Sequence, residues 1–268
     1  MSRKCFLCFI LILWNNFSYA EVISYPNCEL GESLKTPIQL YLSEKVLVTR
    51  TKDAVHQILN KWVNYSNVVL RNSCVPIERY LSKVEFLDDI DETWFQSLSA
   101  AKVLLTLSLG YEPPELNSRS IPSFVGVVFD SYKASFGGSN CGLSSDSGNF
   151  FFAALDCADF VMEHEIGHLS GAHHDHESIL SSHSTLNAFE QTAYPRIQPF
   201  AYGWRCGNYG TVMSFAPQKI PAYSSPELFV GDVACGDQRL GDNARVMRTY
   251  ALHAMFRTVT ILKKANTV

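Results

Sequence analysis

The sequence predicts an α/β fold with a mostly parallel β-sheet, and three patterns support this. Residues 37–42 alternate apolar and mixed side chains, as a strand does. Val55, Leu59 and Trp62 then recur at helical spacing. Residues 102–109 are almost continuously apolar, which is typical of a central strand covered on both faces. Strands that alternate with helices favour a parallel sheet with right-handed connections.

The first half of the chain is expected to complete this alternation. Thr51 or Asp53 can cap the first helix, because short polar side chains accept a hydrogen bond from the amides of a first helical turn. A second strand ends near Phe86, where apolar residues alternate around Glu85. The elements expected in order are a strand at 37–42, this helix, a strand ending at 86, a short helix at 93–100 and a strand at 102–109.

The second half is expected to add two strands and two helices. Asp156 or Asp159 can cap the first of these helices. Residues 176–199 are polar and carry little secondary-structure signal, so an irregular segment is predicted there. The elements expected in order are a Pro-rich loop at 111–122, a strand at 123–129, a Gly-rich turn at 137–142, a strand at 149–155, the capped helix, a tight turn at 209–217 and a helix at 242–258.

Length and composition favour a single domain, or one domain with an appendage. The chain has 268 residues, of which 47% are hydrophobic, and this is enough to bury a sizeable core. The net charge is only −4, with no basic patch that would favour nucleic-acid binding and no acidic tail. No internal repeat or interdomain linker is evident.

Residues 1–20 have the pattern of a signal peptide. Basic residues precede an apolar run from Phe6 to Trp14, and the small residues Ser18 and Ala20 suit a signal peptidase. The run is too short to span a bilayer, and no later segment is long and apolar enough to do so. We therefore expect a secreted protein, periplasmic or extracellular, with an uncleaved anchor as the alternative.

The cysteines predict three disulfides. Two of the eight lie in the predicted signal peptide, and an even number remains in an exported chain. Six cysteines allow fifteen connectivities, so the pairing stays open at this stage. The preferred pairing joins neighbours along the chain, because each pair would then clip one layer of the fold. These pairs are Cys28 with Cys74, Cys141 with Cys157, and Cys206 with Cys235.

A histidine-rich motif predicts a catalytic metal site. Residues four apart share one face of a helix, so His164 and His168 can offer two imidazole nitrogens to one ion, with Glu165 beside them as a base. Gly171 can adopt a left-handed conformation, end the helix and return the chain so that His174 supplies a third nitrogen. Three protein ligands and one open position are the pattern of a catalytic Zn²⁺ site.

The extended motif from His164 to His174 continues into a Met-containing turn at 209–217, and this combination resembles the metzincin zinc metallopeptidases. The resemblance is closer to the reprolysin (adamalysin)-like branch and its secreted bacterial relatives. Three features carry it: Asp175 directly after the third histidine, the segment 125–129 ahead of the helix, and the Met-turn at 211–215. It covers most of residues 36–258, although only the histidine motif and the Met-turn are specific.

The resemblance implies a fold and a division of the chain. It implies a twisted, mostly parallel five-stranded sheet with one antiparallel edge strand, an active-site helix, a Met-turn and a C-terminal helix. Residues 21–268 would form the catalytic domain. Its N-terminal subdomain would end at about 171, and its C-terminal subdomain would begin at about 172.

The resemblance also implies roles for individual residues. His164, His168 and His174 would bind zinc, and Glu165 would act as general base and then as general acid. Met213 would form a hydrophobic floor under the metal, and Asp175 would anchor the site by hydrogen bonds from below. The residues implied to bind substrate are Val125, Gly126 and Val127 on an edge strand and Ala216, Pro217 and Ile220 in a pocket wall.

Some residues of the motif have alternative readings. His173 adjoins the third ligand, but only His174 has the six-residue step from His168, so His173 and His176 are expected at the surface or rim. Phe215 stands where some metzincin branches carry a tyrosine that assists catalysis. Cys28 could cap the metal as a thiolate, although a disulfide is favoured in an exported chain.

The function that follows is a secreted zinc-dependent metalloendopeptidase with one catalytic ion. We expect a monomer whose partner is a peptide or protein substrate, with no nucleic acid and no membrane span. The rival is a secreted zinc-binding effector that uses the same fold to dock on a partner without hydrolysis.

Overall fold

The computed structural model describes residues 21–91, 94, 97–117, 122–131, 141–144, 148–192 and 197–265. The predicted signal peptide and most of the turn predicted at 137–142 lie outside the described residues. Across the described ranges, no helix is both long enough and apolar enough to cross a membrane.

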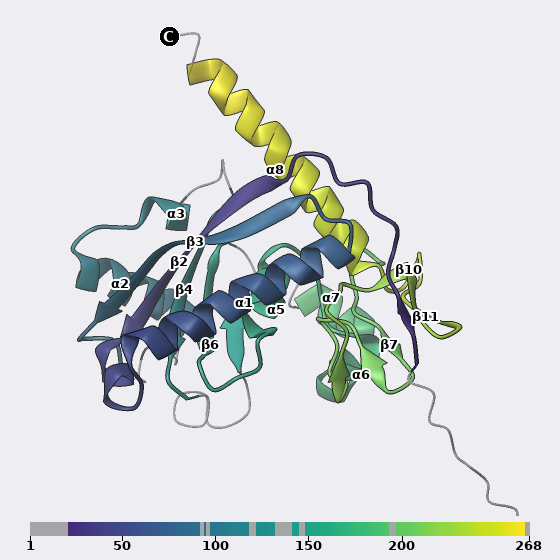
Figure 1. The fold of residues 1–268 in the computed structure, drawn as a ribbon, viewed down its shortest axis with the longest axis horizontal. Coiled ribbons are helices and arrows are strands. Elements are labelled where there is room, and N and C mark those ends of the chain that lie inside the picture. The colour runs from purple at the N-terminus through teal and green to yellow at the C-terminus, as the bar shows by residue number, and fades with distance from the viewer. Residues whose placement is uncertain are drawn as a thin grey trace, which may run out of the picture.

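A mixed α/β fold is confirmed, with a five-stranded sheet in the order β3-β2-β4-β6-β5 (Figure 1). Strands β2, β3, β4 and β6 run parallel to their neighbours among these four, whereas β5 pairs with β6 in the antiparallel direction. The strand bounds are β2 Leu34–Ser43, β3 Ile77–Leu87, β4 Phe124–Phe129, β5 Gly142–Ser144 and β6 Phe150–Ala154.

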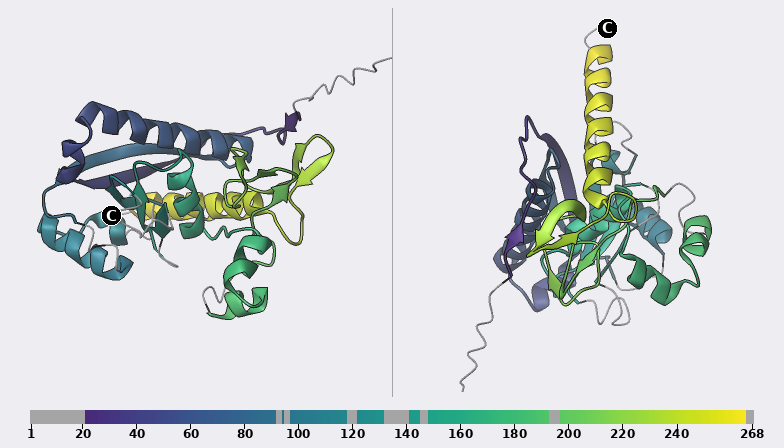
Figure 2. Two further views of the ribbon diagram at one scale, coloured as in Figure 1. Left: turned by 90° about the horizontal axis from the view of Figure 1, so that it is seen from below. Right: turned by 90° about the vertical axis from the view of Figure 1, so that its right-hand side faces the viewer.

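Helices cover both faces of this sheet. Helices α1 (Lys52–Asn72) and α5 (Val161–Leu169) pack on one face, where Leu59, Trp62 and Ile166 are fully buried in a single apolar cluster. Helix α2 (Leu98–Leu109) packs on the other face, and Figure 2 shows α1 and α2 on opposite sides. The Thr51 side chain caps α1 by accepting a hydrogen bond from the Ala54 amide, as predicted.

The strand predicted at 102–109 is wrong, because these residues continue helix α2. Ser97 caps the helix through the Ala100 amide, and Gly110 ends it with a φ of +71°. Only Ala101 and Leu105, four residues apart, are buried on α2. The apolar run therefore presents one helical face to the sheet and leaves other apolar side chains exposed.

The cap predicted for α5 is also wrong. The N-cap residue is Phe160, and it makes no side-chain capping hydrogen bond. The Asp156 carboxylate accepts a hydrogen bond from Ser131 Oγ instead, at 2.7 Å. The helix begins directly after a tight backbone turn, in which the Val161 amide donates to the Ala158 carbonyl.

The C-terminal part contains more structure than predicted. The segment 176–199 includes two helices, so the irregular segment expected there is a further correction. The C-terminal end of the last helix projects away from the body in Figure 1 and in the right-hand view of Figure 2. The remaining elements are β1 Ile23–Ser24, η1 Glu44–Val48, α3 Pro114–Asn117, α6 His176–Ser182, α7 Leu186–Thr192, β7 Arg205–Cys206, β8 Tyr209–Gly210, β9 Gln218–Lys219, β10 Ser225–Val230, β11 Val233–Cys235 and α8 Asn243–Ala265.

All three predicted disulfides are present. Cys28 bonds to Cys74, Cys141 to Cys157, and Cys206 to Cys235. The bond at Cys28 excludes a free thiolate at that position. Cys141 directly precedes β5 and Cys157 lies shortly before α5, so the second disulfide joins the sheet edge to the approach to the histidine helix.

Candidate active site

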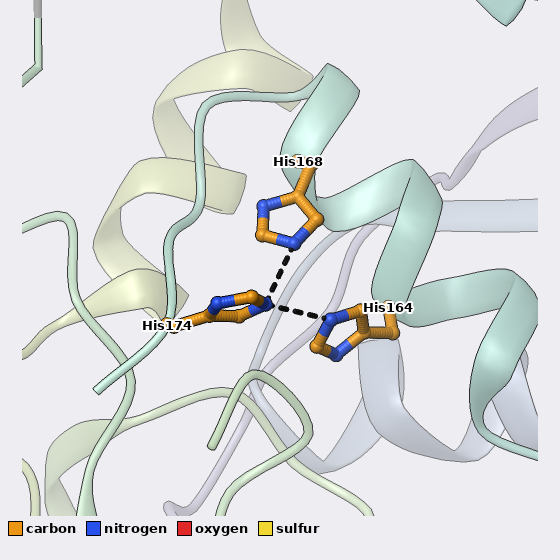
Figure 3. A group of neighbouring side chains, drawn as sticks. All are labelled: His164, His168 and His174. Atoms are coloured by element: carbon orange, nitrogen blue, oxygen red, sulfur yellow. Dashed lines mark hydrogen bonds between the residues drawn. The ribbon is translucent and has the colours of Figure 1, made fainter. Parts of the chain in front are cut away.

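Three histidines converge on one point beside helix α5 (Figure 3). His164 and His168 project from the helix, and His174 reaches them from the loop that follows. Nε2 of His174 lies 3.0 Å from Nε2 of His164 and 3.0 Å from Nε2 of His168. The chain therefore brings the predicted ligand set together.

In two of these rings, a backbone carbonyl next to Nδ1 fixes the tautomer. Nδ1 of His164 lies 3.0 Å from the Val212 carbonyl, and Nδ1 of His168 lies 3.0 Å from the Ala172 carbonyl. A carbonyl only accepts, so each Nδ1 carries the donated proton and each Nε2 keeps its lone pair. The Nε2 lone pairs of His164 and His168 thus face Nε2 of His174. A cation bound between the three nitrogens would remove the repulsion between such lone pairs. The donor set fits Zn²⁺, with backbone carbonyls orienting the ligands.

Burial keeps the rings neutral. It lowers the pKa of His164 to about 3 and that of His168 to about 4, with the neighbouring His168 contributing at His164. It also lowers the pKa of His174 well below its ordinary value. A neutral imidazole is the form that binds a metal ion.

The loop that carries His174 is held on both sides. Gly171 has a φ of +96°, the left-handed conformation that ends α5 and turns the chain back. The His173 amide donates to the Ala201 carbonyl at 3.0 Å, while the His173 carbonyl accepts from the Gly203 amide at 2.8 Å and Asn243 Nδ2 at 2.9 Å. These backbone hydrogen bonds hold the main chain next to His174 in place without any contribution from the His174 ring.

His173 is buried, which corrects the prediction that it lies at the surface or rim. Only 3% of it is exposed, and its ring centroid lies 6.2 Å from that of His168 and 5.7 Å from that of Phe189. His176, half-buried, packs its ring against Tyr202. His173 belongs to the wall of the site, whereas His174 belongs to the converging group.

Glu165 lies next to this group in a confined position. Its residue exposure is 5%, and burial raises the pKa of its carboxyl to about 8, an effect that a hydrogen bond with the Ser144 side chain partly opposes. The carboxylate rests against Gly142 of the edge strand β5. A Cβ at Gly142 would lie 2.5 Å from Glu165 Oε1 and 2.7 Å from its Cγ.

Substituting Gly142 with Ala is therefore expected to move the Glu165 carboxylate. We expect Gly142→Ala to lower kcat by about 10- to 100-fold, since a displacement near 1 Å can cost about that much, while the bound metal per protein stays the same. Steady-state kinetics with metal analysis measure this. Gly31→Ala is the control, because nothing lies within 4 Å of a Cβ there. A kcat for Gly142→Ala equal to that of Gly31→Ala would contradict the expectation.

Met213 lies under the histidine helix. It is fully buried, and its Sδ would lie 2.7 Å from a Cβ built at Gly167, which stands one residue before His168. The Tyr223 hydroxyl would lie 3.1 Å from the same Cβ. Gly167 is thus the point at which the helix rests directly on the Met-containing turn.

Asp175 connects the third histidine to that turn. Its Oδ2 accepts from the Phe215 amide at 3.1 Å and its Oδ1 accepts from the Ser178 amide at 3.1 Å. Arg205 forms an ion pair with it, Nε to Oδ1, at 3.0 Å. Asp175 is 3% exposed, so these bonds compensate a charge that would otherwise be costly to bury.

A cavity of about 420 Å³ opens beside the histidines and Glu165. Its walls come from β5, the start of α5, the region of α6 and α7, and Phe215 of the Met-turn. The lining includes Leu143, Ser144, Phe160, His173, Phe189 and Phe215.

Val125, Gly126 and Val127 cannot form the predicted substrate-binding edge. Strand β4 is paired on both sides, with β2 and with β6, and its residues are buried. A Cβ at Gly126 would lie 2.6 Å from the Phe151 ring and 2.7 Å from a Leu40 methyl group. The glycine therefore accommodates core side chains and not a bound peptide.

The predicted pocket wall also needs correction. Ile220 is fully buried in a separate cluster with Cys206 and Cys235, and it does not line the cavity. Ala216 and Pro217 do not line it either. Phe215, 58% exposed, occupies that side of the cavity. Its ring centroid lies 4.6 Å from that of His174.

The resemblance implied one antiparallel edge strand, but sequence reasoning did not locate it at β5. This strand ends the sheet beside the cavity, and its other edge pairs with no strand among the described residues. Its signal in the sequence is weak, because it is only three residues long. The disulfide at Cys141 and the glycine at position 142 were the available indications.

Comparison with known proteins gives partial similarities. No family model matches the chain. A curated relative, the peptidyl-Asp metalloendopeptidase of Xanthomonas campestris pv. campestris, is 34% identical over 134 residues, which span 44% of this chain and 28% of the relative. The chain thus matches less than a third of that relative's length.

Two solved structures are similar to the chain. A chain of a chaperone–substrate complex matches with a TM-score of 0.61 and 16% identity, over 84% of this chain and 35% of that one. Metalloproteinase-II from Bacteroides fragilis matches with a TM-score of 0.44 and 13% identity, over 88% of this chain and 58% of that one. The first supports the fold alone.

Proposed function

We propose that this protein is a secreted zinc-dependent metalloendopeptidase of the metzincin type, closest to the reprolysin-like branch. The observation that carries the proposal is the convergence of three imidazole Nε2 atoms next to a buried carboxylate in an open cavity. The similarity to a metalloendopeptidase supports it. Three disulfides agree with an exported protein.

His164, His168 and His174 would hold the ion, and Met213 and Asp175 would support them from below. A bound Zn²⁺ supplies Lewis acidity to the scissile carbonyl and to the attacking water. Glu165 would take a proton from that water and pass it to the leaving amine. Glu165 lines the cavity beside Gly142, and the water and the peptide bond would bind in that cavity.

An extended peptide would bind along the unpaired edge of β5. Edge addition of a strand uses backbone hydrogen bonds and therefore tolerates varied sequences. Leu143 and Ser144 line the cavity from this strand, so a peptide paired there would run past Glu165. Because the similar curated protein is a peptidyl-Asp metalloendopeptidase, peptides that contain aspartate are the first substrates to test.

The test is digestion of casein and of a peptide library by the purified oxidised protein. We expect cleavage to stop with a zinc chelator and to return with about one equivalent of Zn²⁺ per chain, as three ligands with one open position require. Mass spectrometry reads the cleaved bonds. A protein that binds zinc but cleaves no peptide would contradict the proposal and would favour the non-hydrolytic effector.

A further inference from the structure

Lys219 holds a positive charge behind one wall of the cavity. It lies on β9, and its Nζ is buried with no hydrogen-bond partner among the described residues. The ammonium group lies 4.9 Å from the centroid of the Phe160 ring and 5.6 Å from that of Phe215. Both rings line the cavity. The charge is therefore one aromatic layer away from the site.

Among the described residues, Lys219 Nζ has no hydrogen-bonded carboxylate partner. Asp175 acts on Lys219 electrostatically, but it already accepts bonds from Ser178 and the Phe215 amide and pairs with Arg205. Arg205 adds a second positive charge nearby. Burial lowers the pKa of Lys219 to about 8, so most of the ammonium remains charged at neutral pH. A buried donor without an acceptor costs free energy that aromatic contacts offset only in part.

Of the two aromatic rings between Lys219 and the cavity, only the Phe215 ring is free to rotate. Phe160 stands at the start of α5, whereas Phe215 is 58% exposed and packs mainly against the His164 and His174 rings. Rotation of the Phe215 side chain is therefore not blocked by the core. The same contacts place Lys219 on the side of the cavity where His164 and His174 meet.

We propose that Lys219 determines specificity: when the Phe215 ring turns aside, Nζ donates hydrogen bonds to the carboxylate of an acidic substrate residue beside the cleaved bond. This inference rests on the proposed function and adds the residue that reads the substrate. A charge-assisted hydrogen bond of this kind distinguishes an acidic side chain from its amide, because the uncharged amide cannot compensate the positive charge of the ammonium group.

The test uses two alanine-based peptides that differ only by Asp or Asn at one position. For Lys219→Met we expect the ratio of kcat/KM, Asp over Asn, to fall by about 10- to 100-fold, the range of a hydrogen bond to a charged group. Lys219→Arg should retain most of the preference, and Lys219→Glu should reverse it. An unchanged ratio in Lys219→Met would overturn the proposal, because a purely structural lysine would alter stability without altering this ratio.

Lys52→Met is the matched control. Lys52 Nζ lies 5.3 Å from the centroid of the Phe86 ring, so the substitution removes a comparable cation–aromatic contact away from the cavity. The Asp over Asn ratio should not change in this variant. If it fell as in Lys219→Met, the effect would be a general one of charge and the proposal would fail.

A binding measurement separates this inference from the proposed activity. Calorimetric titration of zinc-loaded Glu165→Gln protein with the two peptides needs no turnover. We expect the Asp peptide to bind about tenfold more tightly than the Asn peptide, as one charge-assisted hydrogen bond allows, and the difference to vanish when Lys219→Met is added. Equal affinities would overturn the role of Lys219 even if peptides are cleaved, whereas unequal affinities without any cleavage would overturn only the proposed function.

Discussion

Replacing Glu165 with Gln is expected to lower peptide cleavage by at least about 100-fold, because a positioned general base contributes about 10²- to 10⁴-fold. The amide has nearly the same shape and can occupy the same place against Gly142, but it cannot accept a proton. The three histidines are unchanged, so the bound zinc per chain should stay constant. Steady-state kinetics and elemental analysis of the same preparation measure both quantities.

Glu78→Gln is the matched control for this substitution. Glu78 is an exposed carboxylate on β3, at the opposite edge of the sheet from β5, and its loss should leave cleavage unaffected. Glu165→Gln with activity close to that of Glu78→Gln would remove Glu165 from the mechanism. Loss of zinc together with activity would instead indicate that the carboxylate supports the metal ligands.

Removing the cation of Arg79 is expected to destabilise the fold by about 3–5 kcal/mol, the usual cost of leaving a buried charge without its partner. Arg79 and Glu163 have fully buried side chains, joined by bonds of 2.5 Å from Nε and 3.0 Å from Nη2. Burial works to lower the pKa of Arg79, yet Glu163 raises it overall. Glu163 also accepts from the Tyr223 hydroxyl at 2.7 Å.

Denaturant unfolding of the oxidised protein measures this change in the variant Arg79→Met. The double variant with Glu163→Leu should recover much of the loss, because it removes both buried charges together. A loss below about 1 kcal/mol in Arg79→Met, the scale of an exposed pair, would show that Glu163 is hydrated or neutral in the fold. The pair joins β3 to Glu163, the residue before His164, so Arg79→Met should also bind zinc more weakly.

The convergence of the three histidines could be predicted from the sequence because its geometry is local. His164 and His168 are one helical turn apart, and Gly171 sets the return of the chain by its own φ of +96°. His174 follows three residues later. Short-range periodicity and one left-handed residue therefore specify most of the convergence, and little long-range information is needed.

The helix at 98–109 shows where local pattern misleads. A run of apolar residues suits a buried strand and a helix packed on a sheet equally well. Leu and Ala favour the helix, whereas β-branched residues would favour the strand. The Ser97 cap and the Gly110 terminus marked the helix, and these two signals outweigh the hydrophobic run.

The strand that forms the sheet edge beside the cavity could not be located from the sequence because strand order is a long-range property. Segment 124–129 precedes β5 in the chain but lies between β2 and β6 in the sheet. Its glycine indicates a close approach, and only the fold shows that the approaching groups are Phe151 and Leu40. The Arg79–Glu163 pair escaped notice for the same reason, since its partners are 84 residues apart.

The Cys141–Cys157 disulfide has a consequence for when the protein matures. It closes a covalent ring that contains β5 and β6 and ends shortly before α5, so the strand edge beside Glu165 is secured by an oxidation event. Thiols stay reduced in the cytosol and pair after export. In the proposed secreted enzyme, the chain would be made without the covalent link between the edge strand β5 and the approach to α5, and this link would form only after export.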